Sequence, residues 1–213
     1  LDQIDVAVTV DWREQFKMLK LRFPVHSHFH KITYEVPYGH IERFANGEEE
    51  PGQSWIDLSG SARDTGDVYG VSILNNAKYS FDANIRDIGM TVVRSPIYAH
   101  HIPAVPQPEG YYSFIDQGIQ RFNYVILPHE ASWDKADTVR KAAELNQRPI
   151  VLVGTYHEGK LPLSASYFEV DQPNVNLTVL KKWEDGDDLV VRVYETAGKA
   201  TSARLRVLNR KFD

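Results

Sequence analysis

Strict alternation of apolar and polar side chains is the feature that most constrains the fold of this chain. Residues 4–12 place Ile4, Val6, Val8, Val10 and Trp12 in alternation with Asp5, Ala7, Thr9 and Asp11. Residues 16–25 repeat the pattern, with Leu19, Leu21, Phe23 and Val25 on one face and Lys20 and Arg22 on the other. Because successive side chains of a β-strand point to opposite faces, each segment is predicted to be a strand with one buried face.

Shorter apolar runs between polar or Pro-containing segments predict further strands. They are residues 32–36, 39–44, 55–58, 69–74, 78–81, 88–93, 122–127 and 150–153. The pair Asn75-Asn76 predicts a tight reversal, because Asn tolerates positive φ and its side chain bonds the neighbouring backbone. One helix is predicted over residues 132–146, with Ser132 as its N-cap and Pro149 as its stop.

The composition changes at residues 154–162, which are predicted to be a linker. The chain is predicted to be all-β, with a large β-sandwich domain that includes the helix in residues 1–154 and a small β-meander in residues 163–213. The expected meander strands are residues 164–170, 175–183, 189–195 and 203–208, with the hairpin turn at 184–187. A piece of about fifty residues is small for an independent core, so the meander is expected to pack on the sandwich. Trp183 is the candidate contact across that seam, and burial within the meander's own core is the alternative.

Composition excludes several classes of function. The chain has 213 residues and a net charge of −5, and it contains no run of Lys and Arg that would follow a nucleic-acid backbone. It has no apolar run of about eighteen residues, so no membrane span is predicted. The lack of Cys excludes disulfides and fits a reducing cytoplasm, which is the expected location. Both ends lie close to predicted strands, which suggests a piece of a longer polypeptide.

Three histidines at alternate positions, His26, His28 and His30, are the candidates for a metal site. They share one face if the strand is regular, and imidazole is a common zinc ligand. Neither a carboxylate nor a further His at a familiar spacing completes the set, so a solvated strand face is the favoured interpretation and metal binding stays open. The pair His100-His101 in a Pro-rich loop is a weaker candidate.

Carboxylates are the candidates for acid–base chemistry. Glu48, Glu49 and Glu50 form a run that Asp57 follows. Glycoside hydrolysis needs two carboxyl groups held at a set separation, but a run of Glu in a loop is usually solvated, and that interpretation is favoured. The sequence has no Gly-x-Ser-x-Gly, phosphate-binding Gly loop or His-Glu-x-x-His motif.

Aromatic residues give the main alternative function, a carbohydrate-binding β-sandwich module. A planar ring can stack on the face of a sugar, and the chain contains 4 Trp and 11 Tyr. Trp12 and Trp55 follow buried strand patterns and are predicted to belong to the core. Tyr111 and Tyr112, in the long Pro-rich loop, are the best candidates for exposed sugar-binding rings.

Several segments occur in an order that resembles a known family. They are residues 50–59, 70–82, 90–96, 116–118 and 122–129, joined by residues 10–14, 19–25 and 194–198. In this order they resemble the C-terminal β-domain of the α-mannosidases of glycoside hydrolase family thirty-eight. Asn76 and Ser80 depart from the usual Asp and Gly, which puts the local loop geometry in question rather than the resemblance.

The resemblance implies a large β-supersandwich followed by a small all-β piece. It also implies that the zinc site and the carboxylates of a retaining mechanism lie in an N-terminal α/β-barrel domain that this chain does not contain. The resemblance therefore implies no catalytic or metal residue on this chain, which alone is expected to be inactive and without its own cofactor. Its expected partners are its own N-terminal catalytic domain and a mannoside substrate, and a homo-oligomer is possible.

Arg94 is the one substrate-side residue that the resemblance implies. In some relatives an Arg at the end of the strand matching residues 90–94 approaches the sugar pocket. The alternative is an Arg at the end of a strand that pairs with a surface carboxylate.

Overall fold

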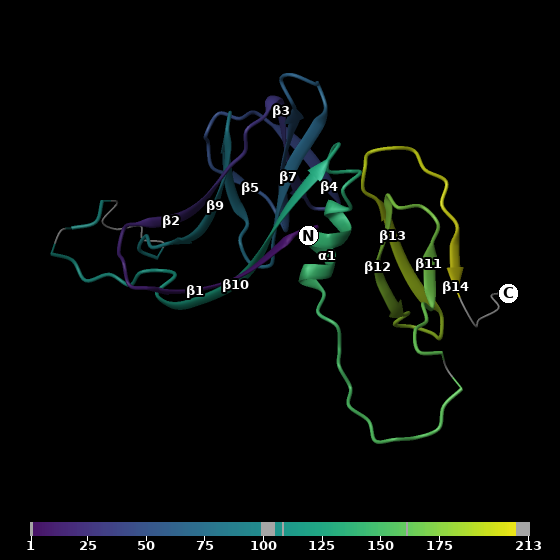
Figure 1. Cartoon of the computed structure of the whole chain (residues 1–213). Helices are drawn as coiled ribbons and strands as arrows, with labels where there is room; N and C mark the ends of the chain where they lie inside the picture. Colours follow the sequence, from purple (N-terminus) through teal and green to yellow (C-terminus); the bar gives the residue numbers. More distant parts are fainter. Residues whose placement is uncertain (1, 99–104, 108, 161, 208–213) are drawn as a thin grey trace. The chain divides into compact units, whose positions relative to one another are not determined.

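The computed structural model describes residues 2–98, 105–107, 109–160 and 162–207. It divides into two compact units, Leu1–Asn146 and Gln147–Asp213 (Figure 1). All paired strands are antiparallel, and α1 (Thr138–Asn146) is the only helix in the part of the chain that is described, so the all-β class with one helix is confirmed. Within those residues, no helix has the length and apolar character needed to cross a membrane.

The first unit is built on a six-stranded sheet. In spatial order its strands are β1 (Ile4–Trp12), β10 (Gly118–Glu130), β7 (Val68–Asn75), β6 (Trp55–Ser61), β3 (His28–Val36) and β4 (Gly39–Arg43). The strongly alternating segment β1 pairs with β10 over its whole length, from Ile4 opposite Ile126 to Trp12 opposite Gly118. Segments at the two ends of the unit in sequence therefore lie side by side.

A four-stranded sheet covers one face of the larger sheet. Its spatial order is β2 (Met18–Pro24), β9 (Asp87–Arg94), β8 (Ser80–Asn84) and β5 (Glu50–Pro51). The core between the two sheets includes Ile56, Ile73, Phe81 and Met90, all of which are fully buried. Each such side chain contributes about 1.5–3 kcal/mol through removal of its apolar surface from water.

Helix α1 covers the opposite face of the six-stranded sheet. Because side chains alternate along a strand, neighbours of the inner core residues point the other way. Trp55, Leu74 and Val125 pack there against Ala142 of α1 and form a second core cluster. The first unit therefore has three layers, with the six-stranded sheet in the middle (Figure 1). The predicted burial of Trp55 is confirmed, since 1% of its surface is exposed.

The helix begins later than the sequence predicted. Residues 133–137 form turns, and the Ser132 hydroxyl just before them donates to Asp134 rather than capping the helix. Asp137 has a positive φ of 56°, and its carbonyl accepts the first helical hydrogen bond from Lys141 at 2.9 Å. The left-handed residue ends the turn segment, so the regular helix starts at Thr138.

The Asn75-Asn76 reversal is confirmed, but only one of its two expected causes operates. The Asn75 side-chain oxygen accepts the backbone N–H groups of Ala77 at 3.0 Å and Lys78 at 2.6 Å. Neither Asn has a positive φ. Asn75 is fully buried and also donates toward the carbonyls of Gln53 and Ser54, so it fixes the turn from inside the sheet.

The second unit contains two two-stranded sheets. They are β11 (Phe168–Val170) with β14 (Leu205–Val207), and β12 (Val175–Lys182) with β13 (Leu189–Glu195). The hairpin between β12 and β13 turns at residues 183–188, as predicted. The pairing of β11 with β14 differs from a simple meander, because the first and last strands pair with each other and enclose the hairpin in sequence.

Residues 150–153 are not the strand that their apolar sequence predicted. They have no secondary structure, and Ile150, Val151, Leu152 and Val153 are between 79% and 96% exposed. An apolar run forms a strand only where a neighbouring strand pairs with it, and none does so within the described residues. The seam contact of Trp183, which is 45% exposed, stays a prediction, as do the division at 154–162 and the packing of residues 163–213 on the sandwich.

Candidate functional site

The candidate site lies where β9 ends and β10 begins. Met18 opposite Arg94 is the last pair of the β2–β9 ladder, and Ser95 continues it by accepting the Phe16 N–H at 2.8 Å and donating to the Lys17 carbonyl at 2.9 Å. The Asp116 carboxylate accepts the Arg94 backbone N–H at 3.1 Å. The end of β9 is therefore tied to the segment that leads into β10.

The side chain of Arg94 is exposed at this strand end. Within the described residues its guanidinium makes no hydrogen bond and no ion pair, so the surface carboxylate that would have been its alternative partner is not found there. A guanidinium is a planar group of fixed donors suited to oxygen-rich ligands. Its role toward a substrate stays a prediction.

Lys78 joins the same neighbourhood from the Asn75-Asn76 turn. Its ammonium lies over the Phe122 ring, 4.9 Å from the ring centre, which is a cation–π arrangement. Burial lowers the pKa of Lys78, and the negative charge of Asp116 partly opposes this. Lys78, Arg94 and Asp116 thus come together from three segments far apart in sequence, and we refer to these three residues as the strand-end site.

Arg94 was predicted from the sequence, but the two other members of the strand-end site were not. Residues 70–82 and 116–118 were both noted as matching segments, which was the available signal. Nothing in them showed that Lys78 and Asp116 approach each other, because that depends on how β7, β9 and β10 are aligned.

An aromatic hollow of about 300 Å³ adjoins this strand end. Phe16, Tyr111, Tyr112 and Phe114 line it, and the Phe16 and Phe114 rings meet edge to face with centres 5.0 Å apart. Tyr111 is 98% exposed, as predicted, whereas Tyr112 is half-buried and its hydroxyl accepts the Gln107 N–H at 2.8 Å. Of the two predicted sugar-stacking rings, Tyr111 is the one that is free to contact a ligand.

The three histidines of residues 26–30 do not share a regular strand face. A β-bulge interrupts the pairing between His28 and Lys31, and Phe29 has a positive φ of 48°, so the alternation breaks. No group of three or more His, Cys, Asp or Glu among the described residues could hold a metal ion. The described residues thus do not fit a zinc site. His100 and His101 lie outside the described residues.

The acidic run is not simply solvated, which corrects the interpretation made from sequence. Glu49 pairs with Lys20, and Glu50 lies 3.6 Å from Arg43. Glu48 alone fits the expectation, since it is exposed and bonds only the nearby Asn46. These carboxylates serve the structure and do not face one another across a groove.

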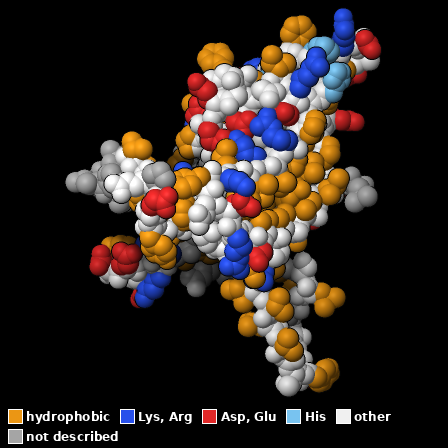
Figure 2. Space-filling model, turned by 90° about the vertical axis from the view of Figure 1, so that its left-hand side faces the viewer, with side chains coloured by type: hydrophobic (Ala, Val, Ile, Leu, Met, Phe, Trp, Pro, Cys, Tyr) orange, Lys and Arg blue, Asp and Glu red, His pale blue; other side chains and the backbone are white. Residues whose placement is uncertain are grey.

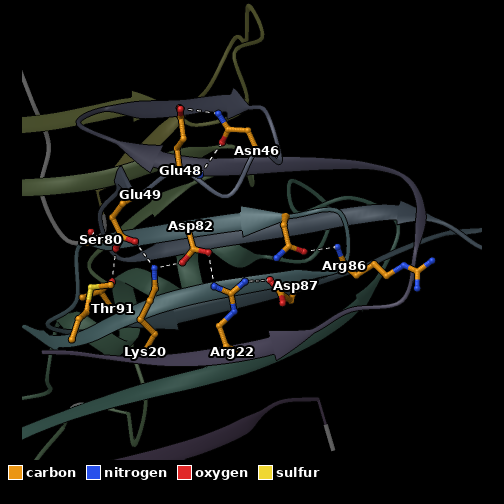
Figure 3. Close-up of polar contacts among 12 residues, drawn as sticks. Lys20, Arg22, Asn46, Glu48, Glu49, Ser80, Asp82, Arg86, Asp87 and Thr91 are labelled. Carbon is orange, nitrogen blue, oxygen red and sulfur yellow. Dashed lines mark hydrogen bonds and ion pairs between the residues drawn. The ribbon is translucent and has the colours of Figure 1, made fainter.

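Glu49 belongs to a charged network on the four-stranded sheet, which comprises Lys20, Arg22, Glu49, Asp82 and Asp87. Figure 3 shows Lys20 between Glu49 and Asp82, and Arg22 between Asp82 and Asp87. Acidic and basic side chains also stand side by side on the face shown in Figure 2. The alternating charges tie β2 to β8 across β9.

Asp57 and His129 form a second buried polar cluster under α1. The Asp57 carboxylate is fully buried and accepts from Ser72 at 2.7 Å, from Ser59, and from His129 Nε2 at 2.7 Å. Ser72 and Asp57 both approach the same ring nitrogen of His129, whereas a Ser-His-Asp relay needs one partner on each nitrogen. Among the described residues the buried His129 Nδ1 has no partner, and Ser72 also contacts Thr138 of α1 at 2.8 Å, so the cluster fastens strands and helix and is not a catalytic triad.

Comparisons with known proteins point in one direction. The model of the glycosyl hydrolases family 38 C-terminal domain matches residues 1–109, and that of the family 38 C-terminal beta sandwich domain matches residues 174–213. Alpha-mannosidase G of Dictyostelium discoideum is 29% identical over 215 residues, covering 94% of this chain and 18% of that protein. Alpha-mannosidase 2C1 of Mus musculus is 28% identical over 201 residues, covering 89% of this chain and 17% of that protein.

A solved structure of a glycosyl hydrolase family 38 protein from Enterococcus faecalis has the same fold. It aligns with a TM-score of 0.80 at 19% identity and covers 99% of this chain and 24% of that chain. This likeness confirms the β-sandwich architecture. The chain spans less than a fifth of the length of the curated relatives that it matches.

Proposed function

The chain belongs to the family of glycosyl hydrolase family 38 C-terminal domains, and from this membership we propose that it is the C-terminal β-portion of an α-mannosidase. The full-length enzyme hydrolyses terminal α-mannosides with retention. The names of the curated relatives support this proposal, and the lack of Cys is compatible with a cytoplasmic enzyme.

In this proposal the chain supports the sugar site and does not carry the chemistry. A preceding catalytic domain supplies the zinc ion and the two carboxylates of the retaining mechanism. The carboxylates of this chain that were candidates are paired within its own fold, as Glu49 and Asp57 show. The isolated chain is therefore inactive.

The observation that carries this supporting role is the exposed Arg94, whose guanidinium has no partner among the described residues, beside an aromatic hollow. We infer that the strand-end site forms part of the wall of the sugar pocket, with the Arg94 guanidinium donating to substrate hydroxyl oxygens. A charged hydrogen bond of this kind is worth about 1.5–3 kcal/mol, so its loss lowers kcat/KM by about 10- to 100-fold.

The test replaces Arg94 by Ala in the full-length enzyme and measures turnover of an aryl α-mannoside. Arg86→Ala is the matched control, because Arg86 flanks the other end of β9 and its exposed side chain is also unpaired among the described residues. Arg94→Ala is expected to lower kcat/KM while Arg86→Ala does not. Equal activity of the two variants would refute the role of Arg94.

The inactivity of the chain alone has its own test. The 213-residue chain is incubated with zinc and the aryl mannoside, and turnover above background contradicts the proposal. A stand-alone carbohydrate-binding module is the alternative, and it is not favoured because the chain matches a domain of much longer enzymes. Homo-oligomer formation stays a prediction that sedimentation at several concentrations checks.

A further inference from the structure

Asp116 occupies a backbone conformation that is uncommon for residues other than Gly, although Asp tolerates it better than most. Its φ is 54°, in the left-handed region, which costs a residue other than Gly free energy and persists only where the surroundings enforce it. The surroundings here are well defined, because Ile115 N–H donates to the Pro96 carbonyl at 3.1 Å and the Gln117 amide donates to the Glu14 carbonyl at 2.9 Å. Hydrogen bonds of both sequence neighbours therefore fix the backbone at Asp116.

This conformation directs the Asp116 carboxylate at the end of β9. The Arg94 N–H, which it accepts at 3.1 Å, is a backbone group that β2 leaves unused at the last pair of the ladder. A neutral amide oxygen could accept the same hydrogen bond. The hydrogen bond alone therefore does not account for a charged residue at this position.

The charge of Asp116 acts on Lys78. The Lys78 ammonium is partly removed from water over the Phe122 ring, and burial disfavours its charged form. Asp116 is the acid that counteracts this burial. The Asp116 carboxylate thus acts on Arg94 through a hydrogen bond and on Lys78 through its charge.

We propose that Asp116 is a positioning residue that fixes the end of β9 under Arg94 and sets a negative charge near the partly buried Lys78 ammonium. The inference rests on the proposed function, in which Arg94 faces the sugar. Asp116 itself contacts no substrate. It thereby presents two positive groups, the exposed Arg94 guanidinium and the partly buried Lys78 ammonium, to the hydroxyl oxygens of a bound mannoside.

The first experiment separates the hydrogen bond from the charge in the 213-residue chain. Asp116→Asn keeps an oxygen acceptor and tolerates a positive φ, whereas Asp116→Ala removes both acceptor and charge. Glu14→Gln is the control, because Glu14 is an exposed carboxylate of the same region that pairs with Lys17. NMR titration follows the Lys78 side chain, and hydrogen exchange follows the Arg94 amide.

The inference predicts that Asp116→Asn lowers the pKa of Lys78, because the opposing negative charge is lost, and that Glu14→Gln leaves it unchanged. It also predicts that the Arg94 amide exchanges about 10-fold faster in Asp116→Ala than in Asp116→Asn. An unchanged pKa of Lys78 in Asp116→Asn overturns the charge role. Equal exchange of the Arg94 amide in the two variants overturns the backbone role.

The second experiment measures turnover of the aryl α-mannoside by the full-length enzyme. Asp116→Asn is expected to lower kcat/KM about 3- to 10-fold through KM, with Glu14→Gln unaffected. An effect of Arg94→Ala without an effect of Asp116→Asn overturns this inference and leaves the proposed function standing. No effect of Arg94→Ala overturns the proposed function, and the inference falls with it.

Discussion

Asp82 is the centre of the charged network, and replacing it by Asn tests how much that network stabilises the sandwich. Its side chain is 6% exposed and pairs with both Lys20 and Arg22 (Figure 3). Asn keeps the size and one acceptor oxygen but removes the charge. Lys20 and Arg22 then lie close to each other without the negative charge between them.

Asp82→Asn is expected to lower the free energy of unfolding by less than the loss of one partner of a fully buried ion pair. Removing one partner of a buried pair costs about 3–5 kcal/mol, because the other charge is left uncompensated. Here each cation keeps a second carboxylate, Glu49 for Lys20 and Asp87 for Arg22, and Arg22 is 38% exposed to screening solvent. We therefore expect Asp82→Asn to lower the free energy of unfolding by about 2 kcal/mol at pH 7.

The pH dependence of this loss has a definite sign. Burial by itself would raise the pKa of Asp82, but the hydrogen bonds and charges of Lys20 and Arg22 outweigh it, so the folded pKa lies below its usual value. A lowered folded pKa contributes stability that is fully present above the unfolded value, about 3.9, and is lost as pH falls through the folded value. The difference in the free energy of unfolding between wild type and Asp82→Asn should thus become smaller as the pH falls toward 3.

The assay is urea unfolding followed by Trp fluorescence at pH 7, 5, 4 and 3. A Trp183→Phe background leaves Trp only in the first unit, so the signal reports the sandwich. Asp64→Asn is the control, because Asp64 is exposed in a loop and should change stability by less than about 0.5 kcal/mol. A loss that is the same at pH 7 and pH 3, or below about 0.5 kcal/mol at pH 7, would refute the reasoning.

Further predictions concern the same unit and the linker. A Cβ at Gly89 would clash with Asp82 and lie 2.6 Å from Arg22 Nη1, so Gly89→Ala should lower the free energy of unfolding in urea by about 1–3 kcal/mol. Gly39→Ala is the control and should be nearly neutral, because the space around Gly39 is open; equal effects of the two substitutions would contradict this. Asp57→Ala leaves three buried donors without their acceptor and should cost about 3 kcal/mol, and a loss under about 1 kcal/mol would show that they find other partners. Limited proteolysis should cut first at residues 150–160, which are exposed and without secondary structure, and the released C-terminal fragment should unfold. A dispersed NMR spectrum of that fragment would mean that the two units fold independently.

The alternation of apolar and polar residues was sufficient to predict strands of the sandwich, because it reflects directly which side chains are buried. Residues 4–12 were predicted and observed with the same limits, and the predicted 55–58 extends to Ser61 as β6. The extension follows from pairing with β7, which an isolated segment does not reveal. Residues 150–153 failed for the converse reason, since their apolar sequence met no partner strand among the described residues.

The candidate site was only partly predictable, because it consists of contacts between distant segments. Arg94 was named from a resemblance, and the exposed Tyr111 from its Pro-rich loop. Lys78 and Asp116 approach each other through the register of three strands, and no spacing in the sequence encodes that approach. The positive φ at Asp116 was equally hidden, since Asp gives no sign of it beyond a modest tolerance of the left-handed region.

The charged network and the strand-end site share two strands, and this links stability to the geometry of the site. Lys20 and Arg22 clamp β2 to β8 across β9, and the same β2–β9 ladder ends at Met18 and Arg94. Its register shifts between Leu19 and Lys20, at the junction between the clamped part and the end that carries Arg94. A bulge is a place where a strand bends, so loosening the clamp should displace the end of β9 before it unfolds the sheet. Asp116, attached to that end through the Arg94 N–H, is then one of the contacts that resist the displacement, together with the backbone hydrogen bonds of Ser95.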